Sequence, residues 1–178
     1  MELLDLYTKD RILTGKTVKR GEKVPEGYYG LVVHVCVFNS KGEMLIQKRS
    51  PQKELFGNLW DITAGGCVIS GEKSEDAAHR ELFEELGIDV SFKNIRPSMT
   101  IHYEDGFDDL YMIVRDVNTQ KVKLQSEEVS AVKWATKEEI LSMIEDGTFI
   151  PYFKEKISYL FAVKDYRGVF VPKGYEYL

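Results

Sequence analysis

The sequence predicts an α/β sandwich built around one mixed β-sheet. Three observations lead to this fold class: short apolar segments recur along the chain, two or three segments have helical spacing, and Gly- or Pro-containing turns separate them. The length of 178 residues is near that of one domain and is enough for a substantial core. We therefore expect a single domain that spans residues 1–178.

The first half of the chain is predicted to consist mainly of strands. Residues 1–28 are expected to form an N-terminal extension, with a short strand or hairpin followed by a Gly/Pro loop. Buried or half-buried strands are expected over residues 30–39 (GLVVHVCVFN) and 43–49 (EMLIQKR). A loop rich in Pro, Lys and Gly covers 50–58, and residues 59–68 (LWDITAGGCV) are predicted to be one strand that runs into a glycine pair.

A helix is predicted to begin after Ser74 and to end at Leu86. Ser74 is a suitable N-cap, and the acids that follow it favour the positive end of the helix dipole. Gly87 is a natural residue for the left-handed turn that ends a helix.

The second half alternates strands with helices. Three strands are predicted, over residues 91–104, 108–117 and 131–136. A capped helix is expected over 136–147, and a last helix is expected to begin at Pro151, because proline is tolerated in the first helical turn. This last helix and the tail make up residues 148–178.

The overall composition excludes several classes of protein. The net charge of −5 and the pI near 5.3 argue against broad binding to nucleic acid or to an anionic membrane surface. No apolar run approaches the roughly 18 residues of a membrane span, and the N-terminus lacks the basic start of a signal peptide. Cys36 and Cys67 form no CxxC pair, which fits a reduced compartment. We expect a cytoplasmic protein.

The segment RELFEELG, which begins at Arg80, carries an unusual group of carboxylates. On the predicted helix, Glu81, Glu84 and Glu85 share a ridge, and Arg80 is expected on the opposite flank. The apolar stripe that should pack on the sheet consists of Ala78, Leu82 and Leu86. Three carboxylates held rigidly suit a hard divalent cation, which prefers oxygen ligands. The alternative is a solvated acidic face.

The residues around this ridge complete a longer pattern. Gly66 is followed by five residues and Glu72, then by seven residues and Arg80-Glu81-Leu82, and the pattern ends at Gly87-Ile88. This spacing matches the Nudix box at every defined position over residues 66–88. The chain therefore resembles Nudix hydrolases, and the similarity to the family fold covers residues 29–160.

The resemblance implies a fold, a reaction and a cofactor. The fold is a Nudix-type α/β/α sandwich, in which the box forms a loop, a helix and a loop. The family binds Mg²⁺ or Mn²⁺ and directs water onto a diphosphate linkage, usually in a nucleoside diphosphate joined to another group. On this chain the metal ligands would be Glu81, Glu84, Glu85 and the carbonyl of Gly66.

Further roles follow from the same resemblance. Arg80 would orient the glutamates through charge-assisted hydrogen bonds, and Glu72 would brace the loop through Arg80. The general base in this family is either a box glutamate or an acid on a distant loop. The segment QSEEVSAVKW places Glu127 and Glu128 before a strand, and Glu128 is the distant candidate that we favour. A solvated loop is the alternative there.

The segment LIQKRSPQKELFGNLWDITAGG resembles one branch of the family, the bacterial proteins related to type 1 isopentenyl diphosphate isomerase. In this resemblance Arg49 and Lys53 bind the substrate diphosphate, for which two cations near a metal site are suitable. An ordinary basic surface loop is the alternative.

The chain departs from the isomerase at four places. The isomerase has a cysteine before the first box glycine and a histidine after it, where this chain has Gly65 and Cys67. Gly30 aligns with a metal-binding histidine of the isomerase, and the acidic box, incomplete in the isomerase, is intact here. We therefore predict hydrolysis, with isomerase activity and a non-catalytic nucleotide-binding module as the alternatives.

The expected partner is a small-molecule diphosphate, without nucleic acid or membrane. Because dimers are common in the family, a homodimer is also expected. His34 is predicted to be a satisfied sheet histidine, and His79 a surface residue. The acidic turn after His102 is interpreted as a solvated hairpin, although these residues could also line a substrate pocket.

Overall fold

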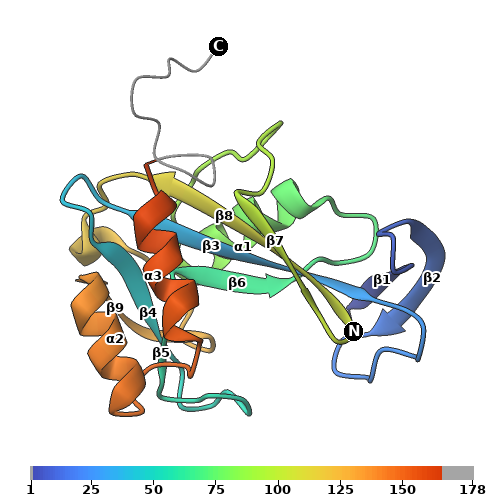
Figure 1. Ribbon diagram of the computed structural model, residues 1–178, viewed down its shortest axis with the longest axis horizontal. Coiled ribbons are helices and arrows are strands. Elements are labelled where there is room, and N and C mark those ends of the chain that lie inside the picture. The colour runs from blue at the N-terminus through green and yellow to red at the C-terminus, as the bar shows by residue number, and fades with distance from the viewer. Residues whose placement is uncertain (1, 166–178) are drawn as a thin grey trace.

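The computed structural model describes residues 2–165. It contains a seven-stranded mixed sheet, a separate two-stranded sheet and three α-helices (Figure 1). The predicted tail beyond residue 165 lies outside the described residues. The strands are β1 Leu3–Tyr7, β2 Leu13–Lys19, β3 Gly30–Phe38, β4 Met44–Arg49, β5 Trp60–Asp61, β6 Ala64–Cys67, β7 Met99–Tyr103, β8 Gly106–Val114 and β9 Val129–Ala135. The helices are α1 Ser74–Leu86, the short 3₁₀ helix Thr119–Lys121, α2 Lys137–Glu145 and α3 Lys154–Val163.

Strand β3 is the centre of the large sheet. It runs parallel to β8, from the pair Gly30↔Gly106 to the pair Phe38↔Val114. It is antiparallel to β4 and β6, and β7 and β9 extend the sheet beyond β8 and β4. The sheet is therefore mixed, which confirms the predicted fold class.

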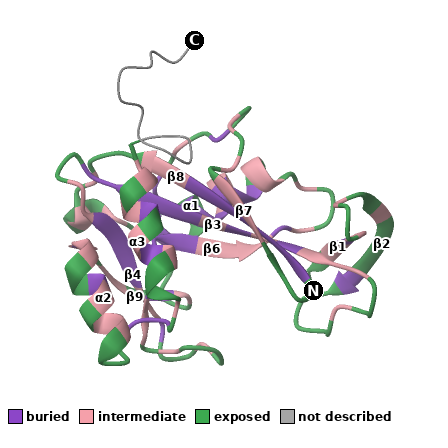
Figure 2. Cartoon of the chain, in the orientation of Figure 1, coloured by how far each residue is buried: buried purple, intermediate pink, exposed green. Residues whose placement is uncertain are grey.

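Alternate residues of β3 face two different cores, because successive side chains in a strand point to opposite faces. Val33 and Val35 pack with α1, whereas Cys36 and Phe38 pack with α2 and α3. Helix α1 thus covers one face and the other two helices cover the opposite face. Figure 2 shows the buried residues concentrated in the central strands between these layers.

The segment 59–68 is two strands rather than the one that we predicted. Strand β5 pairs with β4, and β6 pairs with β3, so the chain changes partner between them. Thr63 lies at the change, where its buried hydroxyl donates to the Leu45 carbonyl and accepts from the Val37 amide. This side chain bridges the two neighbouring strands and replaces the continuous ladder.

Helix α1 ends as predicted but begins differently. Gly87 has φ 64° and donates its N–H to the Leu82 and Phe83 carbonyls, as a left-handed C-terminal residue should. At the other end Lys73 is the N-cap and makes no side-chain cap bond. Ser74 is the first helical residue instead of the cap, because its hydroxyl contacts Asp109 and Tyr111.

The last two helices differ in how well local signals predicted their starts. Thr136 and Glu139 form the reciprocal capping box of α2, as the sequence indicated. Helix α3 begins at Lys154, three residues later than the expected start at Pro151. Just before Pro151, Phe149 bridges to Trp60, the first residue of β5, and Ile150 donates its backbone N–H to the Trp60 carbonyl.

The N-terminal extension is the predicted hairpin. Strands β1 and β2 pair in antiparallel fashion and form their own sheet, which lies at the end of the molecule away from α2 and α3 (Figure 1). Tyr7 and Tyr29 exchange two backbone hydrogen bonds of 2.9 and 3.0 Å that attach the hairpin to the start of β3. Over residues 2–165, no helix combines the length and the apolar character needed to cross a membrane.

Candidate active site

Helix α1 fixes the carboxylate ridge through its buried apolar stripe. The predicted stripe of Ala78, Leu82 and Leu86 is fully buried against the sheet. Glu81 and Glu85 are themselves only 6% and 5% exposed, whereas the side chain of Glu84 is 49% exposed. Two carboxylates of the box are therefore held in the protein interior, and the third lies at the surface.

Arg80 lies on the same flank as the glutamates, so the expected position on the opposite flank is wrong. Its Nη1 donates to Glu81 at 2.7 Å and to Glu84 at 3.3 Å, because residues four apart on a helix are neighbours. Its Nε and Nη2 bind Glu72 at 2.9 Å each, and Nη2 also donates to the Cys67 carbonyl at 3.0 Å. The expected hydrogen bond between Arg80 and Glu72 is present, and it joins the box loop to the helix.

Glu85 is held from the opposite side of the ridge. Gln47 Nε2 of β4 donates to its carboxylate at 3.0 Å, and the amide of Gly65 lies 3.4 Å away. Burial, and after it the charge of Glu81, raise the pKa of Glu85 to about 8, although the Gln47 hydrogen bond opposes this rise.

Gln47 is a site residue that the sequence reasoning missed. The signal was present, since a polar residue follows the buried apolar run MLI and precedes two basic residues. Among the described residues, its Oε1 is the one buried side-chain oxygen or nitrogen without a hydrogen-bond partner. Its hydrogen bond to Glu85 places Gln47 directly beside the ridge.

Gly66 lies directly against Glu81. A Cβ atom at position 66 would approach the Glu81 carboxylate atoms to between 2.1 and 2.7 Å. Only glycine leaves room for the carboxylate beside this segment of backbone. Burial raises the pKa of Glu81, and the neighbouring Arg80 opposes that rise.

The donor set of the ridge fits a hard divalent cation. Two buried carboxylates of like charge, a nearby backbone carbonyl at Gly66 and a movable surface carboxylate at Glu84 are oxygen ligands of the kind that Mg²⁺ prefers. Within residues 2–165, no three acidic, His or Cys side chains already form a group arranged to hold a metal.

The structure brings together the basic loop and the distant acid predicted from sequence. Lys53 forms an ion pair with Glu128, although the two residues are far apart in the chain. Arg49 contacts the Leu55 carbonyl at 3.1 and 3.2 Å and Asp61 at 3.5 Å. The two cations thus have acidic or carbonyl partners in the protein itself.

The loop that carries Glu128 packs against the last turn of α1. Gln125 donates its backbone N–H to the Glu85 carbonyl at 3.0 Å, and Glu128 donates to the Gln125 carbonyl at 2.9 Å. Glu127, the other acid considered, is exposed. Of these two acids, Glu128 is the one that is partly buried and pairs with Lys53.

A second polar cluster lies on the opposite face of β6. His34 Nδ1 is 2.8 Å from the buried Asp108, and Lys156 Nζ is 3.6 Å from that carboxylate. His34 is therefore a satisfied sheet histidine, as predicted, and His79 is a surface residue that pairs with Asp89. The acidic turn is only partly the solvated hairpin that we expected, because Asp108 and its neighbour are buried within β8.

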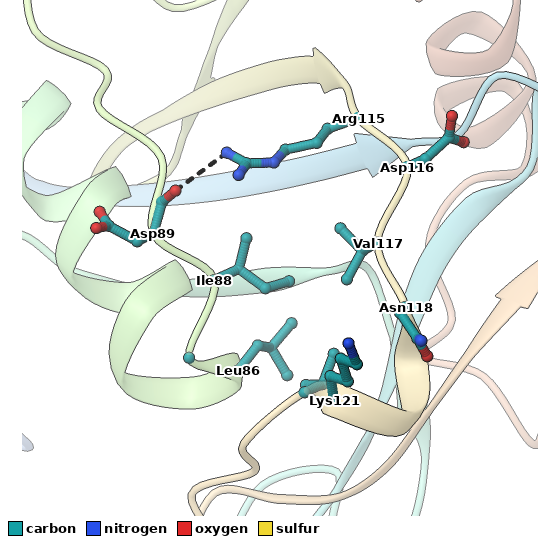
Figure 3. A pocket seen from close by; sticks show the side chains of 10 residues that line it. Leu86, Ile88, Asp89, Arg115, Asp116, Val117, Asn118 and Lys121 are labelled. Atoms are coloured by element: carbon teal, nitrogen blue, oxygen red, sulfur yellow. Dashed lines mark hydrogen bonds between the residues drawn. The ribbon is translucent and has the colours of Figure 1, made fainter.

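A surface hollow lies near the C-terminal end of α1, lined among others by Leu86, Ile88, Arg115, Val117 and Lys121 (Figure 3). Arg115 donates to the Asp89 carbonyl at 3.0 Å across its rim. None of the residues predicted for the site lines it. This hollow is therefore separate from the ridge carboxylates.

Comparisons with known proteins agree with this geometry. The NUDIX domain family model matches residues 28–155. An uncharacterized Nudix hydrolase of Listeria monocytogenes is 48% identical over 153 residues, which cover 86% of this chain and 90% of that protein. A crystal structure of a Deinococcus radiodurans protein superposes with a TM-score of 0.73 and 28% identity, covering 89% of this chain and 98% of that one. The isopentenyl-diphosphate Delta-isomerase 2 of Photorhabdus laumondii is 30% identical over 134 residues, or 70% of this chain and 73% of that protein.

Proposed function

The chain belongs to the Nudix hydrolase family, and from that premise we propose that it cleaves a phosphoanhydride bond in a small-molecule diphosphate with the help of Mg²⁺ or Mn²⁺. The substrate class that fits best is a nucleoside diphosphate linked to another group. One observation carries the proposal: two box carboxylates are buried, Glu81 against the Gly66 backbone and Glu85 beside the Gly65 amide, and within residues 2–165 no cationic side chain pairs with Glu85.

The residues of the ridge have distinct proposed tasks. Glu81, Glu84 and Glu85, with the Gly66 carbonyl, would hold the metal. When bound, the metal would neutralise the charge that a diphosphate gathers in the transition state and would activate water. Arg80 keeps Glu81 and Glu84 in position, and its bonds to Glu72 keep the loop and helix in register.

Arg49 and Lys53 would bind the substrate diphosphate, and Glu128 would be the general base. The ion pair between Lys53 and Glu128 supports the view that substrate binding at Lys53 affects the charge state of the base. An anionic substrate that attracts Lys53 would release Glu128 as a free carboxylate, which a base requires. Binding of substrate would in this way prepare the base.

The isomerase relative gives the second candidate function its specific support. The space around Gly65 argues against it. A Cβ at this position would lie 2.4 Å from His34 Cδ2 and 3.0 Å from the Val33 carbonyl, so a cysteine there would require the His34 ring to turn aside and the Val33 carbonyl to move slightly. In this structure His34 packs against the position that carries a cysteine in the isomerase, which favours hydrolysis.

We also propose that the enzyme acts in the cytoplasm and as a homodimer. The free thiols of Cys36 and Cys67 fit a reducing compartment, and burial raises the pKa of the Cys36 thiol to about 12, which keeps it unreactive. Light scattering during gel filtration tests the oligomeric state, and a mass of about 20 kDa would exclude the dimer.

A product assay tests the proposed reaction. The enzyme with Mg²⁺ is incubated with nucleotide sugars, dinucleotides, nucleoside triphosphates and isopentenyl diphosphate, and products are identified by mass and by phosphorus NMR. The proposal expects cleavage of a phosphoanhydride that the Glu85→Gln variant no longer performs. Conversion of isopentenyl to dimethylallyl diphosphate without cleavage would overturn it in favour of the isomerase.

A further inference from the structure

The N-terminal hairpin contacts the loop that precedes the box helix. Leu4 and Ile69 form an antiparallel bridge, and Ser70 donates its backbone N–H to the Leu3 carbonyl at 2.7 Å. The two oxygens of Asp5 accept from the Ser70 hydroxyl at 2.7 Å and from the Gly71 amide at 2.8 Å. Figure 1 shows the hairpin beside this loop between β6 and α1.

The turn of the hairpin makes a second contact, with Asp109 of β8, which in turn binds the first residue of α1. Arg11 forms a bidentate ion pair with Asp109, whose side chain is completely buried. The same carboxylate accepts from the Thr100 hydroxyl at 2.7 Å and from the Ser74 hydroxyl at 2.5 Å. Asp109 thereby joins the hairpin, strand β7 and the start of the box helix.

Arg11 occupies an unfavourable backbone conformation to make this contact. Its φ is 60°, in the left-handed region that glycine and asparagine adopt far more readily. A residue with a Cβ persists there only where surrounding interactions compensate, and such positions are concentrated at functional sites. The bidentate pair with Asp109 is the compensating interaction.

A chain of contacts connects these two attachments to the carboxylates. Gly71 is adjacent to Glu72, whose Oε2 also accepts from the Ile69 amide at 3.2 Å. Glu72 binds Arg80 with both oxygens, and Arg80 binds Glu81. A shift of the loop at residues 69–71 would therefore reach the ridge through Glu72 and Arg80.

From these contacts we propose that Asp5 and Arg11 are positioning residues, and that the N-terminal hairpin holds the box loop in the geometry that the metal site needs. The hairpin would thus act on the site through the box loop. Its effect on metal affinity rests on the proposed function, whereas its hold on the loop does not.

Hydrogen exchange and Mn²⁺ binding together test the proposal on the full chain. Asp5→Ala removes both acceptors, whereas Asp5→Asn keeps an oxygen for the Gly71 amide and an amide donor for the Ser70 hydroxyl. Asp10→Ala is the matched control, since Asp10 lies on the same hairpin but pairs only with the exposed Lys9. Arg11→Gly removes the second attachment and relieves the left-handed strain at that position.

We expect Asp5→Ala and Arg11→Gly to speed amide exchange over residues 66–74 at least tenfold and to weaken Mn²⁺ binding at least fivefold, as followed by the electron paramagnetic resonance signal of free Mn²⁺. In Asp5→Asn, both the exchange rates and the Mn²⁺ affinity should stay within about twofold of the wild-type values. In Asp10→Ala, both should equal the wild-type values. Faster exchange confined to residues 2–19, or unchanged Mn²⁺ affinity beside faster loop exchange, would overturn the proposal.

The two measurements separate this proposal from the proposed function. If wild-type protein binds no Mn²⁺, the metal-dependent function fails. The exchange over residues 66–74 then still decides whether the hairpin holds the loop, and unchanged exchange in both variants would overturn that part as well.

Discussion

The ridge on α1 and the basic loop before β5 differ in how their charges are satisfied. On the ridge, Arg80 pairs with Glu81 and Glu84, but Glu85 has only the uncharged donors of Gln47 and Gly65 beside it and a raised pKa. In the loop, Lys53 already has the carboxylate of Glu128 as its partner. The ridge therefore carries more negative than positive charge, whereas the cation of the loop is already paired. Under the proposed function, a metal would complete the first region, and the substrate would have to open the ion pair of the second.

The largest expected effect is on the ridge. Glu85→Gln should lower kcat at least about a hundredfold, on the scale of losing a principal electrostatic catalyst. Steady-state rates with the cleaved diphosphate provide the measurement, and an unchanged circular dichroism spectrum shows that the fold is intact. Near-normal turnover would remove Glu85 from the metal site.

Glu128→Gln should have the next largest effect, on kcat rather than KM. Loss of a general base costs on the order of 10²–10⁴-fold, and the glutamine cannot accept the proton. The matched control is Glu127→Gln, which makes the same replacement of a carboxylate by an amide at the exposed neighbouring residue. Equal, small effects of the two substitutions would assign the base to the ridge instead.

Lys53→Met should mainly raise KM, by about tenfold, because it removes one cation from the diphosphate. If Lys53 and Glu128 act as a coupled pair, the double variant with Glu128→Gln will deviate from the product of the two single effects. Strict additivity of the two substitutions in kcat/KM would contradict the coupling.

The charge of Glu85 should also make the metal-free wild-type protein less stable to unfolding than a variant with a neutral side chain at this position. Glu85→Gln replaces a buried carboxylate whose ionised form is disfavoured, so it should stabilise the metal-free protein at pH 8 by at least about 1 kcal/mol, or about 2–4 °C in Tm. Saturating Mg²⁺ should reduce or reverse the difference in Tm between the two proteins, because the metal is expected to stabilise only wild type. Calorimetry with EDTA and with Mg²⁺ measures both. A lower Tm for the variant in EDTA would contradict the interpretation.

The smallest effect belongs to a cap far from both regions. Thr136→Ala removes the side-chain acceptor of the α2 capping box and should cost about 1 kcal/mol of unfolding free energy. Urea denaturation measures this loss, and kcat should stay within twofold of wild type. A large fall in kcat would mean that α2 contributes to the site.

Sequence reasoning predicted those features that depend on local spacing. The buried stripe of Leu82 and Leu86, the left-handed turn at Gly87 and the capping box at Thr136 each follow from residues within a few positions of one another. The bond between Arg80 and Glu72 followed from the box pattern.

The remaining features depend on contacts between distant segments, which a single sequence does not specify. Ser74 is not the N-cap that we expected, because its hydroxyl binds Asp109. The segment 59–68 forms two strands because its first part pairs with β4 and its second part pairs with β3. Gln47 acquires its role only when β4 lies beside α1. Arg80 is a different case: its place beside Glu84 follows from helix geometry, so that error was one of reasoning.

Metal titration combined with turnover tests the central claim most directly. Wild type and Glu85→Gln would be titrated with Mn²⁺, with bound metal followed by electron paramagnetic resonance and turnover measured in the same samples. The account predicts that wild-type turnover rises in proportion to occupancy and is abolished by EDTA, and that Glu85→Gln loses both metal affinity and turnover. Wild-type metal affinity in Glu85→Gln, or full turnover of metal-free wild type, would contradict it.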